Sequence, residues 1–374
     1  MSGKSADVVV IGGGIAGASI AYRLAEKGLR VILLEKERVG QQASGRAGGG
    51  VRQQNRHPAE LPLAMEAIKI WAQMEEELGC DVEYRRCGNL RLLFTKEEFE
   101  TFSKIMTRER EMGLCVEMIS PPELGQFLPA ISTETGLIAA KYCATDGTAN
   151  PLLVVKAICR TAQRRGVEIR ELEAVRKLRI KNGKIQAAVT DAAEYHAEIF
   201  VNAAGPWARG ICNLVGLDFP QQILRTPLLI TEPLPPLIAP FISWEDMYLR
   251  QALAGNIHLG PQNIRAVTNF DISTHLNEFA HIGRHAPAIF PFLKQVNIIR
   301  AFCGLTHWTP DEIPILDRAP TISNFFLAAG FSGHGFCLGP VVGKLMAEWI
   351  VDGSSSLDLS GLNWSRFDSI MYHK

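Results

Sequence analysis

The pattern that most restricts the fold lies near the N-terminus, where a run of β-branched residues leads into a glycine-rich turn. The strand expected at residues 8–11 is followed by Gly12, Gly14 and Gly17 in the spacing G-x-G-x-x-G. Apolar residues at helical spacing come next, and a second expected strand, "RVILLE", ends at Glu35. A strand, a glycine turn, a helix and an acidic residue in this order predict a dinucleotide-binding βαβ unit.

Each part of this motif has a physical task in holding a dinucleotide. Gly12 permits the tight turn, Gly14 lets the backbone approach a pyrophosphate, and Gly17 lets the helix pack closely on the strand. Glu35 is expected to accept hydrogen bonds from ribose hydroxyls. The other contacts predicted here are Ile15, Ala16 and Lys36. The motif does not separate FAD from NAD, although a first strand at about residue 7 is typical of proteins with resident FAD.

A second glycine cluster, "GQQASGRAGGGVRQ" at residues 40–53, follows the second expected strand directly. Such a loop emerges at the carboxyl edge of a parallel sheet, where ligands bind. A second backbone-lined loop suits a long ligand with a pyrophosphate and a tricyclic ring, whereas NAD enzymes do not need one. A flexible surface loop is the alternative. The predicted cofactor contacts here are Ser44, Gly45, Arg46, Ala47, Gly48 and Gly49.

Composition excludes several classes of function. The chain is 47% hydrophobic and 21% charged. Its 39 Lys and Arg residues balance its 39 Asp and Glu residues, and a net charge of zero does not favour binding to nucleic acid. Its eight cysteines form no C-x-x-C pair, so we predict no metal site and a reducing compartment. No apolar stretch is long enough for a transmembrane helix. A cytoplasmic protein is expected, and a peripheral contact with the inner membrane face stays open.

The chain resembles the FAD-dependent amino-acid and amine oxidoreductases of the D-amino-acid oxidase type. This family includes glycine oxidase, the sarcosine oxidases and the flavin subunits of heteromeric proline and opine dehydrogenases. The matching segments run in family order and are the N-terminal fingerprint, "ASGRAGGGVR", "DGTANPLLVVKAICRTAQRRGVEI", "FVNAAGPWA", "GLTHWTPDEIPILD" and "FSGHGF".

The resemblance implies an α/β fold with two discontinuous domains. A Rossmann-like FAD-binding domain with a parallel sheet is expected at residues 1–80, 145–225 and 300–374. A substrate domain with a large antiparallel sheet is expected at residues 81–144 and 226–299.

The resemblance also implies further FAD contacts late in the chain. The last glycine cluster, "GFSGHGFCLG", is expected as a turn along the flavin ring, with a following helix that directs its positive end at the ring. The flavin is expected to be non-covalent, because the cysteine that attaches it in some relatives falls at Gly304. The implied contacts are Val175, Ala203, Ala204, Gly205, Trp207, Gly304, Gly333, His334, Gly335 and Phe336.

The substrate site needs a cation for the carboxylate of an amino acid. By resemblance to the sarcosine oxidases, Arg52 at the end of the glycine loop takes this role. Tyr248 and Arg250, in "DMYLRQ", are expected to cap the substrate. His307, which follows the position where glycine oxidases carry an arginine, and His334 complete the candidate catalytic residues.

Two departures from the family pattern bear on the electron acceptor. Cys337 stands where sarcosine oxidases carry a lysine, and His258 stands loosely where they carry the lysine that activates oxygen. We therefore expect a dehydrogenase of a proline-, sarcosine- or opine-like amino acid, paired with a different subunit that accepts electrons. The alternatives are a self-sufficient oxidase that produces hydrogen peroxide and a non-catalytic flavin relay subunit. An NAD dehydrogenase leaves the two later glycine clusters unexplained.

Overall fold

The computed structural model describes residues 3–132, 134–261 and 266–367, and a six-stranded sheet forms its nucleotide-binding side. Its strands lie in the order β20-β21-β13-β2-β3-β9, and all neighbours except β20 and β21 are parallel. The strands are β2 (Val8–Ile11), β3 (Val31–Leu34), β9 (Glu168–Arg170), β13 (Ile199–Asn202), β20 (Ile315–Arg318) and β21 (Phe325–Ala329). The predicted α/β fold class with a parallel sheet is confirmed.

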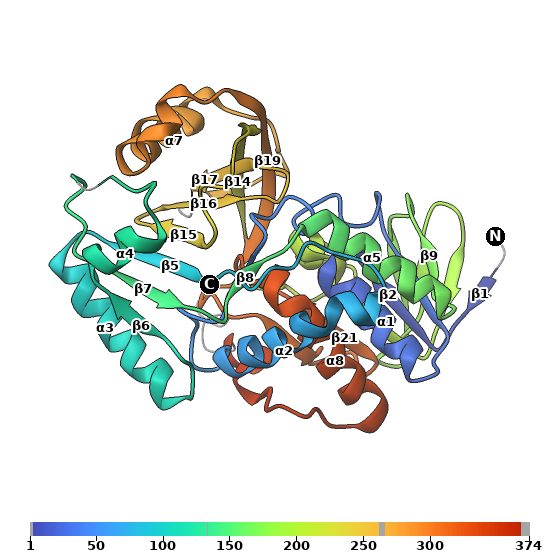
Figure 1. Cartoon of the computed structure of the whole chain (residues 1–374). Helices are drawn as coiled ribbons and strands as arrows, with labels where there is room; N and C mark the ends of the chain where they lie inside the picture. The colour runs from blue at the N-terminus through green and yellow to red at the C-terminus, as the bar shows by residue number, and fades with distance from the viewer. Residues whose placement is uncertain (1–2, 133, 262–265, 368–374) are drawn as a thin grey trace.

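Both faces of this sheet are covered. Val8 and Val10 of β2 pack in the core on the helical side, and Val9 and Ile11 pack in the core on the other side. Such alternation within an all-apolar strand is what a parallel sheet covered on both faces requires. The helical side carries α1 (Ile15–Glu26), α2 (Leu61–Leu78), α5 (Pro151–Arg164) and α8 (Gly335–Asp352) (Figure 1).

The helix α8 begins earlier than the sequence suggested. The stretch of residues 330–339 was expected to be a turn, but α8 starts at Gly335 and includes Gly339. A Cβ atom at Gly339 would lie 2.7 Å from Cγ2 of Ile15 in α1. The glycine is therefore needed for the close packing of two helices, which local sequence does not reveal.

The other face of the six-stranded sheet packs on a four-stranded sheet in the order β1-β12-β11-β10. Its β10 and β11 form the hairpin expected at Asn182 and Gly183, whose φ angles are 52° and 69°. The strands are β1 (Gly3–Ser5), β10 (Lys177–Lys181), β11 (Lys184–Val189) and β12 (Glu194–His196).

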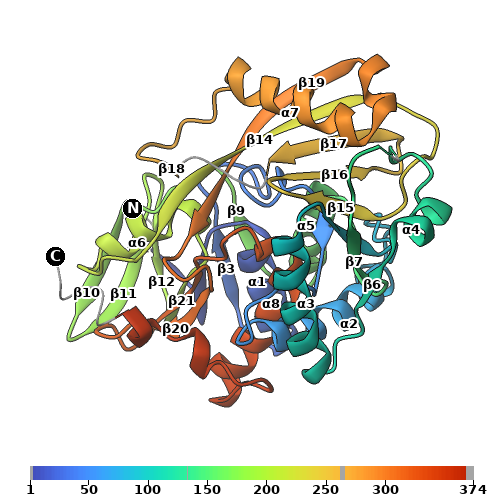
Figure 2. The same ribbon diagram turned by 90° about the vertical axis from the view of Figure 1, so that its left-hand side faces the viewer.

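A nine-stranded sheet forms the second side of the molecule and is mostly antiparallel. Its strands are β5 (Asn89–Leu93), β6 (Glu117–Ile119), β7 (Ala139–Cys143), β14 (Gln222–Pro233), β15 (Phe241–Trp244), β16 (Met247–Gln251), β17 (Asn256–Pro261), β18 (Ala266–Val267) and β19 (Ile298–Trp308). The helix α7 (Leu276–Ile289) lies over β14 and β17 (Figure 2). The division into two domains stays a prediction, and its proposed boundary at residue 300 falls inside β19.

Short elements complete the chain and connect the two sides. The strands β4 (Gly50–Val51) and β8 (Gly147–Thr148) pair with each other. The remaining helices are α3 (Lys96–Glu111), α4 (Pro121–Phe127) and α6 (Ala208–Asn213), and short 3₁₀ turns lie at Gly205–Trp207, Pro291–Gln295, Ser360–Leu362 and Trp364–Phe367. None of the helices in the described ranges is long and apolar enough to cross a membrane.

Candidate functional site

A cavity of about 790 Å³ lies where the carboxyl ends of the parallel strands meet the nine-stranded sheet. One wall consists of the glycine motif, the loop at residues 40–50 and the first turn of α8. The opposite wall consists of residues from β5, β14, β15, β16 and β19. The cavity therefore brings together the three glycine clusters that are far apart in the sequence.

The first glycine cluster leaves no room for side chains at the floor of this cavity. Gly12 has a φ of +109°, and a Cβ atom there would lie 2.4 Å from the carbonyl oxygen of Ala203. A Cβ atom at Gly17 would lie 1.9 Å from the carbonyl oxygen of Gly12. Gly17 does not line the cavity, so it serves the packing of α1 and not a ligand contact.

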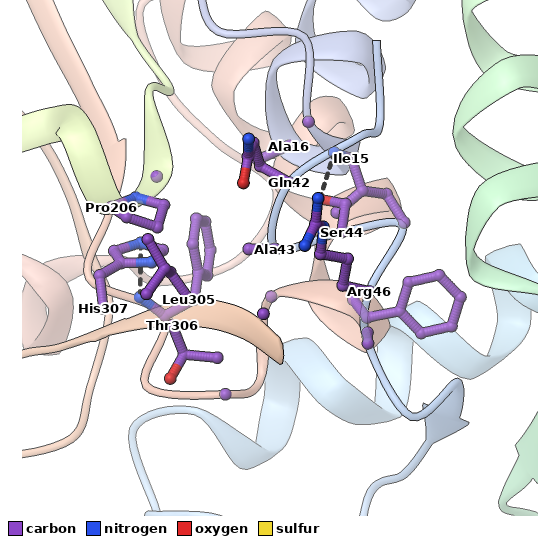
Figure 3. Close-up of a pocket in the computed structure, with 18 of the residues that line it drawn as sticks. Ile15, Ala16, Gln42, Ala43, Ser44, Arg46, Pro206, Leu305, Thr306 and His307 are labelled. Atoms are coloured by element: carbon purple, nitrogen blue, oxygen red, sulfur yellow. Dashed lines mark hydrogen bonds between the residues drawn. The ribbon is translucent and has the colours of Figure 1, made fainter. Parts of the chain in front are cut away.

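The N-terminus of α1 presents unused donors to the cavity. Within the described chain, the backbone N–H groups of Gly14 and Ala16 have no hydrogen-bond partner, and both residues line the cavity. The Ile15 N–H donates to Ser44 Oγ at 3.0 Å, which leaves the hydroxyl proton of Ser44 for a ligand (Figure 3). Free amides and the helix dipole at one point favour an anion such as a pyrophosphate.

Glu35 lies at the next position along the cavity and is held firmly. Its carboxylate accepts the N–H of Gly13 at 2.7 Å and the N–H of Glu37 at 2.8 Å. Burial raises the pKa of Glu35, and the two backbone donors oppose this shift. Each carboxylate oxygen keeps a further lone pair, so the group can still accept ribose hydroxyls.

An aromatic cluster borders the same end of the cavity. Lys36 Nζ lies 3.7 Å from the centroid of the Trp207 ring, and Trp207 stacks on Phe270 with the centroids 4.9 Å apart. Lys36, Val175, Ala204 and Trp207 all line the cavity. Lys36 and Phe270 cover the two faces of the Trp207 ring, so these side chains form an apolar border next to Glu35 against which a base attached to a ribose can pack.

Arg46 ties the second glycine loop to the opposite wall. Its Nη1 donates to the carbonyl oxygen of Cys303 at 2.7 Å, and its Nε donates to the carbonyl oxygen of Gln41 at 2.9 Å. A Cβ atom at Gly304 would lie 3.1 Å from the Cβ atom of Arg46, so Arg46 fills the space that a side chain at position 304 would need. Arg46 therefore fixes the loop against β19, and Figure 3 shows it beside Ser44 in the cavity wall.

The third glycine cluster supplies the first turn of α8. Gly333, His334, Gly335, Phe336 and Cys337 all line the cavity. The backbone N–H groups of Gly335 and Phe336 have no partner within the described chain, as expected at the start of a helix. These donors suit an electron-accepting ring system that gains negative charge on reduction.

The three backbone surfaces together fit FAD. The N–H groups at the N-terminus of α1 suit the pyrophosphate, and Glu35 suits the ribose hydroxyls. The N–H groups at the N-terminus of α8 suit a reducible ring. The cavity is also lined by Ala47, Gly48, Gly49, Ala203, Gly205 and Gly304, which stay predicted FAD contacts. Gly45 does not line the cavity. A Cβ atom at Gly45 would lie 2.0 Å from the carbonyl oxygen of Gly40, within the same loop. Its role is therefore in the shape of the loop.

On the substrate side, Arg52 and Tyr248 both line the cavity. Burial lowers the pKa of Arg52 to about 10, so the guanidinium stays charged at neutral pH. Its Nη1 donates to the carbonyl oxygens of Gln54 and Asn55. The hydroxyl of Tyr248 is buried with no hydrogen-bond partner in the described chain, which is costly unless a ligand satisfies it.

Packing explains the position of Tyr248 and corrects the prediction for Arg250. A Cβ atom at Gly48 or at Gly260 would lie 2.6 Å from the Tyr248 side chain, so both glycines make room for its ring. Arg250 is buried behind Gly49 and does not line the cavity. It was expected to contact the substrate, but its side chain, on the same face of β16 as Tyr248 and two residues further along, packs against the loop at Gly49.

His307 lines the cavity but is already engaged. Its Nε2 accepts the N–H of Phe331 at 3.4 Å, and Figure 3 shows its ring beside Pro206. Burial lowers the pKa of His307 to about 4, so the ring is neutral at physiological pH. This geometry gives His307 a role in holding the turn at Phe331, and the catalytic role expected from sequence stays a prediction.

The structure adds residues that sequence reasoning missed. Asn55, Arg56, Asn89 and Arg91 line the cavity. Glu60 is fully buried, and its carboxylate lies 2.8 Å from Nδ1 of His334. The only signal in the sequence for this group was the four-residue spacing of Arg56 and Glu60 in "RHPAE". Acid–base pairs at this spacing are also common on the surfaces of helices.

The buried histidines predict acid sensitivity. The pKa is lowered mainly by burial to about 3 for His258 and to about 4 for His307 and His334, from 6.5. Between pH 6.5 and about 4 the unfolded chain therefore binds more protons than the folded chain, so stability falls as the pH falls. Each histidine contributes a slope of up to about 1.4 kcal/mol per pH unit, and the raised pKa values of Glu35 and Asp146 offset part of it.

Urea unfolding of the wild-type protein and of His258→Gln at pH 7, 6 and 5 measures this effect. The wild-type free energy of unfolding should drop toward pH 5, and the variant should show a shallower drop. Equal slopes for the two proteins would contradict the assignment of His258 as a histidine that is buried uncharged.

Comparison with protein families gives a match over most of the chain. Residues 7–349 match the model of the FAD dependent oxidoreductases called DAO. The solved structure of L-proline dehydrogenase from P. horikoshii superposes with a TM-score of 0.94 at 29% identity, covering 98% of this chain and 99% of that one.

Two curated relatives are similar at about the same level. The chain is 30% identical to the mitochondrial pyruvate dehydrogenase phosphatase regulatory subunit of Mus musculus, over 98% of this chain and 43% of that protein. It is 29% identical to the peroxisomal sarcosine oxidase of Homo sapiens, over 97% of both proteins. The chain spans less than half the length of several of the curated relatives that it matches.

Proposed function

Since this chain belongs to the family of FAD-dependent oxidoreductases, with FAD as its cofactor, we propose that it oxidises the carbon–nitrogen bond of a small amino acid or N-substituted amino acid. One observation carries the proposal. The cavity that fits FAD is also lined by a cation, Arg52, and by the buried hydroxyl of Tyr248, which has no partner in the described part of the chain. These are the groups that an amino-acid carboxylate needs.

The residues of the chain bind and orient the substrate. Arg52 attracts the carboxylate, and the Tyr248 hydroxyl donates a hydrogen bond to it. Tyr248 is buried and Arg52 is half-buried, so the carboxylate is held largely away from water, where charge-assisted hydrogen bonds are stronger. When bound, FAD supplies the acceptor for the hydride that leaves the carbon beside the amine.

We further propose that the electrons pass to a second, different subunit and not to oxygen. Cys337 occupies the cavity wall where the oxidases that the chain resembles carry a lysine. Burial raises the pKa of the Cys337 thiol to about 11, so no charge is present at that position at neutral pH. The similarity to a regulatory subunit also favours an assembly.

A non-catalytic flavin relay is the less favoured alternative. A relay has no need for a half-buried cation and a buried hydroxyl, without a partner among the described residues, beside the flavin. Burying these groups costs free energy unless a ligand uses them.

An anaerobic substrate panel tests the proposal. Proline, sarcosine and an N-carboxyalkyl amino acid, added without oxygen, should bleach the flavin absorbance for at least one compound. Reduction of an artificial dye should then be faster than production of hydrogen peroxide. Peroxide formation at the rate of dye reduction would support the oxidase, and the absence of bleaching by any amino acid would support the relay.

A further inference from the structure

His334 is held by a buried partner from a distant part of the chain. Glu60, at the N-terminus of α2, is fully buried, and its carboxylate oxygens lie 2.8 and 3.0 Å from Nδ1 of His334. His334 lines the cavity, and its side chain keeps 19% exposure. In the described chain, Nε2 of His334 has no hydrogen-bond partner. One ring nitrogen is therefore engaged inside the protein and the other is available to the cavity.

The surrounding charges hold Glu60 as a carboxylate. Arg56 Nη1 lies 4.0 Å from Glu60 Oε2, and Arg56 is itself fixed because its Nε and Nη2 donate to the carbonyl oxygen of Arg52. His334 and the two guanidiniums lower the pKa of Glu60 against the effect of burial. The same guanidiniums and burial lower the pKa of His334 to about 4, and Glu60 opposes that shift. A carboxylate can only accept, so a neutral imidazole beside it must carry its proton on Nδ1.

We propose that Glu60 is a positioning residue that fixes the proton of His334 on Nδ1, so that the Nε2 lone pair accepts an N–H of the substrate amine. The inference rests on the proposed function, because it needs an amine in the cavity. Arg52 and His334 line the same cavity, and Arg56 connects them, because it donates to the carbonyl oxygen of Arg52 and lies 4.0 Å from Glu60. A carboxylate on Arg52 therefore places the neighbouring amine in the cavity that the imidazole faces.

This arrangement selects among amine substrates. A neutral secondary amine has one N–H to donate and keeps its lone pair for the formation of the carbon–nitrogen double bond. A neutral tertiary amine has no N–H and gains nothing from an acceptor. The site should therefore favour amino acids whose nitrogen carries a hydrogen by about tenfold, the value of one hydrogen bond.

Glu60→Gln separates positioning from simple structure. The amide oxygen of the glutamine should turn toward Arg56, which has only donors, and the amide NH₂ should then face His334. An NH₂ donor at Nδ1 moves the imidazole proton to Nε2, so the cavity gains a donor where it had an acceptor. Glu66→Gln is the matched control, because Glu66 is also on α2 but pairs with Lys344 and Lys69 away from the cavity.

The first measurement is ¹⁵N NMR of histidine-labelled holoprotein, with the His334 signals identified by their loss in His334→Gln. Protonated Nδ1 and unprotonated Nε2 are expected in the wild type and in Glu66→Gln, and the reverse in Glu60→Gln. Unprotonated Nδ1 in the wild type would overturn the proposal. This result decides the matter even if Glu60→Gln does not fold.

The second measurement compares an N-methyl with an N,N-dimethyl amino acid. It uses kcat/KM, or Kd from the flavin absorbance for a compound that is not turned over. The preference for the N-methyl compound should be about tenfold in the wild type and should vanish in Glu60→Gln. An unchanged preference in Glu60→Gln would refute the role of Glu60. If no amino acid binds or bleaches the flavin, the proposed function fails, and the tautomer measured by NMR still stands on its own.

Discussion

Gly12→Ala is expected to give a colourless protein that takes up little or no FAD. The added Cβ atom would lie 2.4 Å from the carbonyl oxygen of Ala203 and 2.8 Å from the Cα atom of Ala204. Backbone atoms cannot move aside as a flexible side chain can, so the turn before α1 must shift. The donors of Gly14 and Ala16 would then lose their common direction toward the pyrophosphate. We expect FAD affinity to fall by at least about 100-fold, or roughly 3 kcal/mol.

Gly28→Ala is the matched control for this prediction. Gly28 also has a positive φ, +86°, but a Cβ atom there would meet no atom within 4 Å. This change therefore adds backbone strain of about 1 kcal/mol without a clash. FAD titration monitored by flavin fluorescence compares the two variants. Equal FAD affinity in Gly12→Ala and Gly28→Ala would show that the turn at Gly12 does not shape the cofactor site.

Arg52→Ala is expected to raise KM for amino-acid substrates by about 10- to 100-fold. A hydrogen bond to a charged group contributes about 1.5–3 kcal/mol, and Arg52 is a half-buried cation that lines the cavity. FAD content should stay close to that of the wild type, because none of the three glycine clusters depends on this guanidinium. Steady-state kinetics with an artificial electron acceptor measures the change.

Two controls separate carboxylate recognition from a general loss of structure. Arg52→Lys keeps the charge but loses the planar fork, so its KM should lie between those of the wild type and Arg52→Ala. The amide of the same amino acid has no carboxylate, so its kcat/KM should be nearly equal in the wild type and in Arg52→Ala. A similar loss for the amide and the acid would indicate that Arg52 supports the loop through its bonds to Gln54 and Asn55.

Local sequence was sufficient where neighbouring residues determine the structure. The β-branched run at residues 8–11, the turn at Gly12 and the hairpin at Asn182 and Gly183 all form as predicted. In each case the backbone preference of a few adjacent residues decides the outcome. The fold class, the family and the FAD cofactor followed from the resemblance of six segments, in order along the chain, to a known family, and all three are confirmed.

Sequence reasoning was weaker where distant residues compete for the same space. Gly339 was assigned to a turn, but it lies inside α8 because Ile15 of α1 packs against it. Arg250 was assigned to the substrate, but it lies behind Gly49 and outside the cavity. The hydrogen bond from the N–H of Phe331 to His307 was not foreseen either, and the catalytic role of His307 stays a prediction. None of these contacts has a local pattern that could reveal it.

The sequence by itself therefore determined the βαβ unit at the N-terminus, because the preferences of residues for strand, turn and helix act over a few neighbouring positions. Only the tertiary structure decided which polar groups share the cavity and what state they are in. The pairing of Glu60 with His334 joins residues 274 positions apart. Burial and the neighbouring guanidiniums then set the charge of both groups, and these depend on the complete packing of the chain around them.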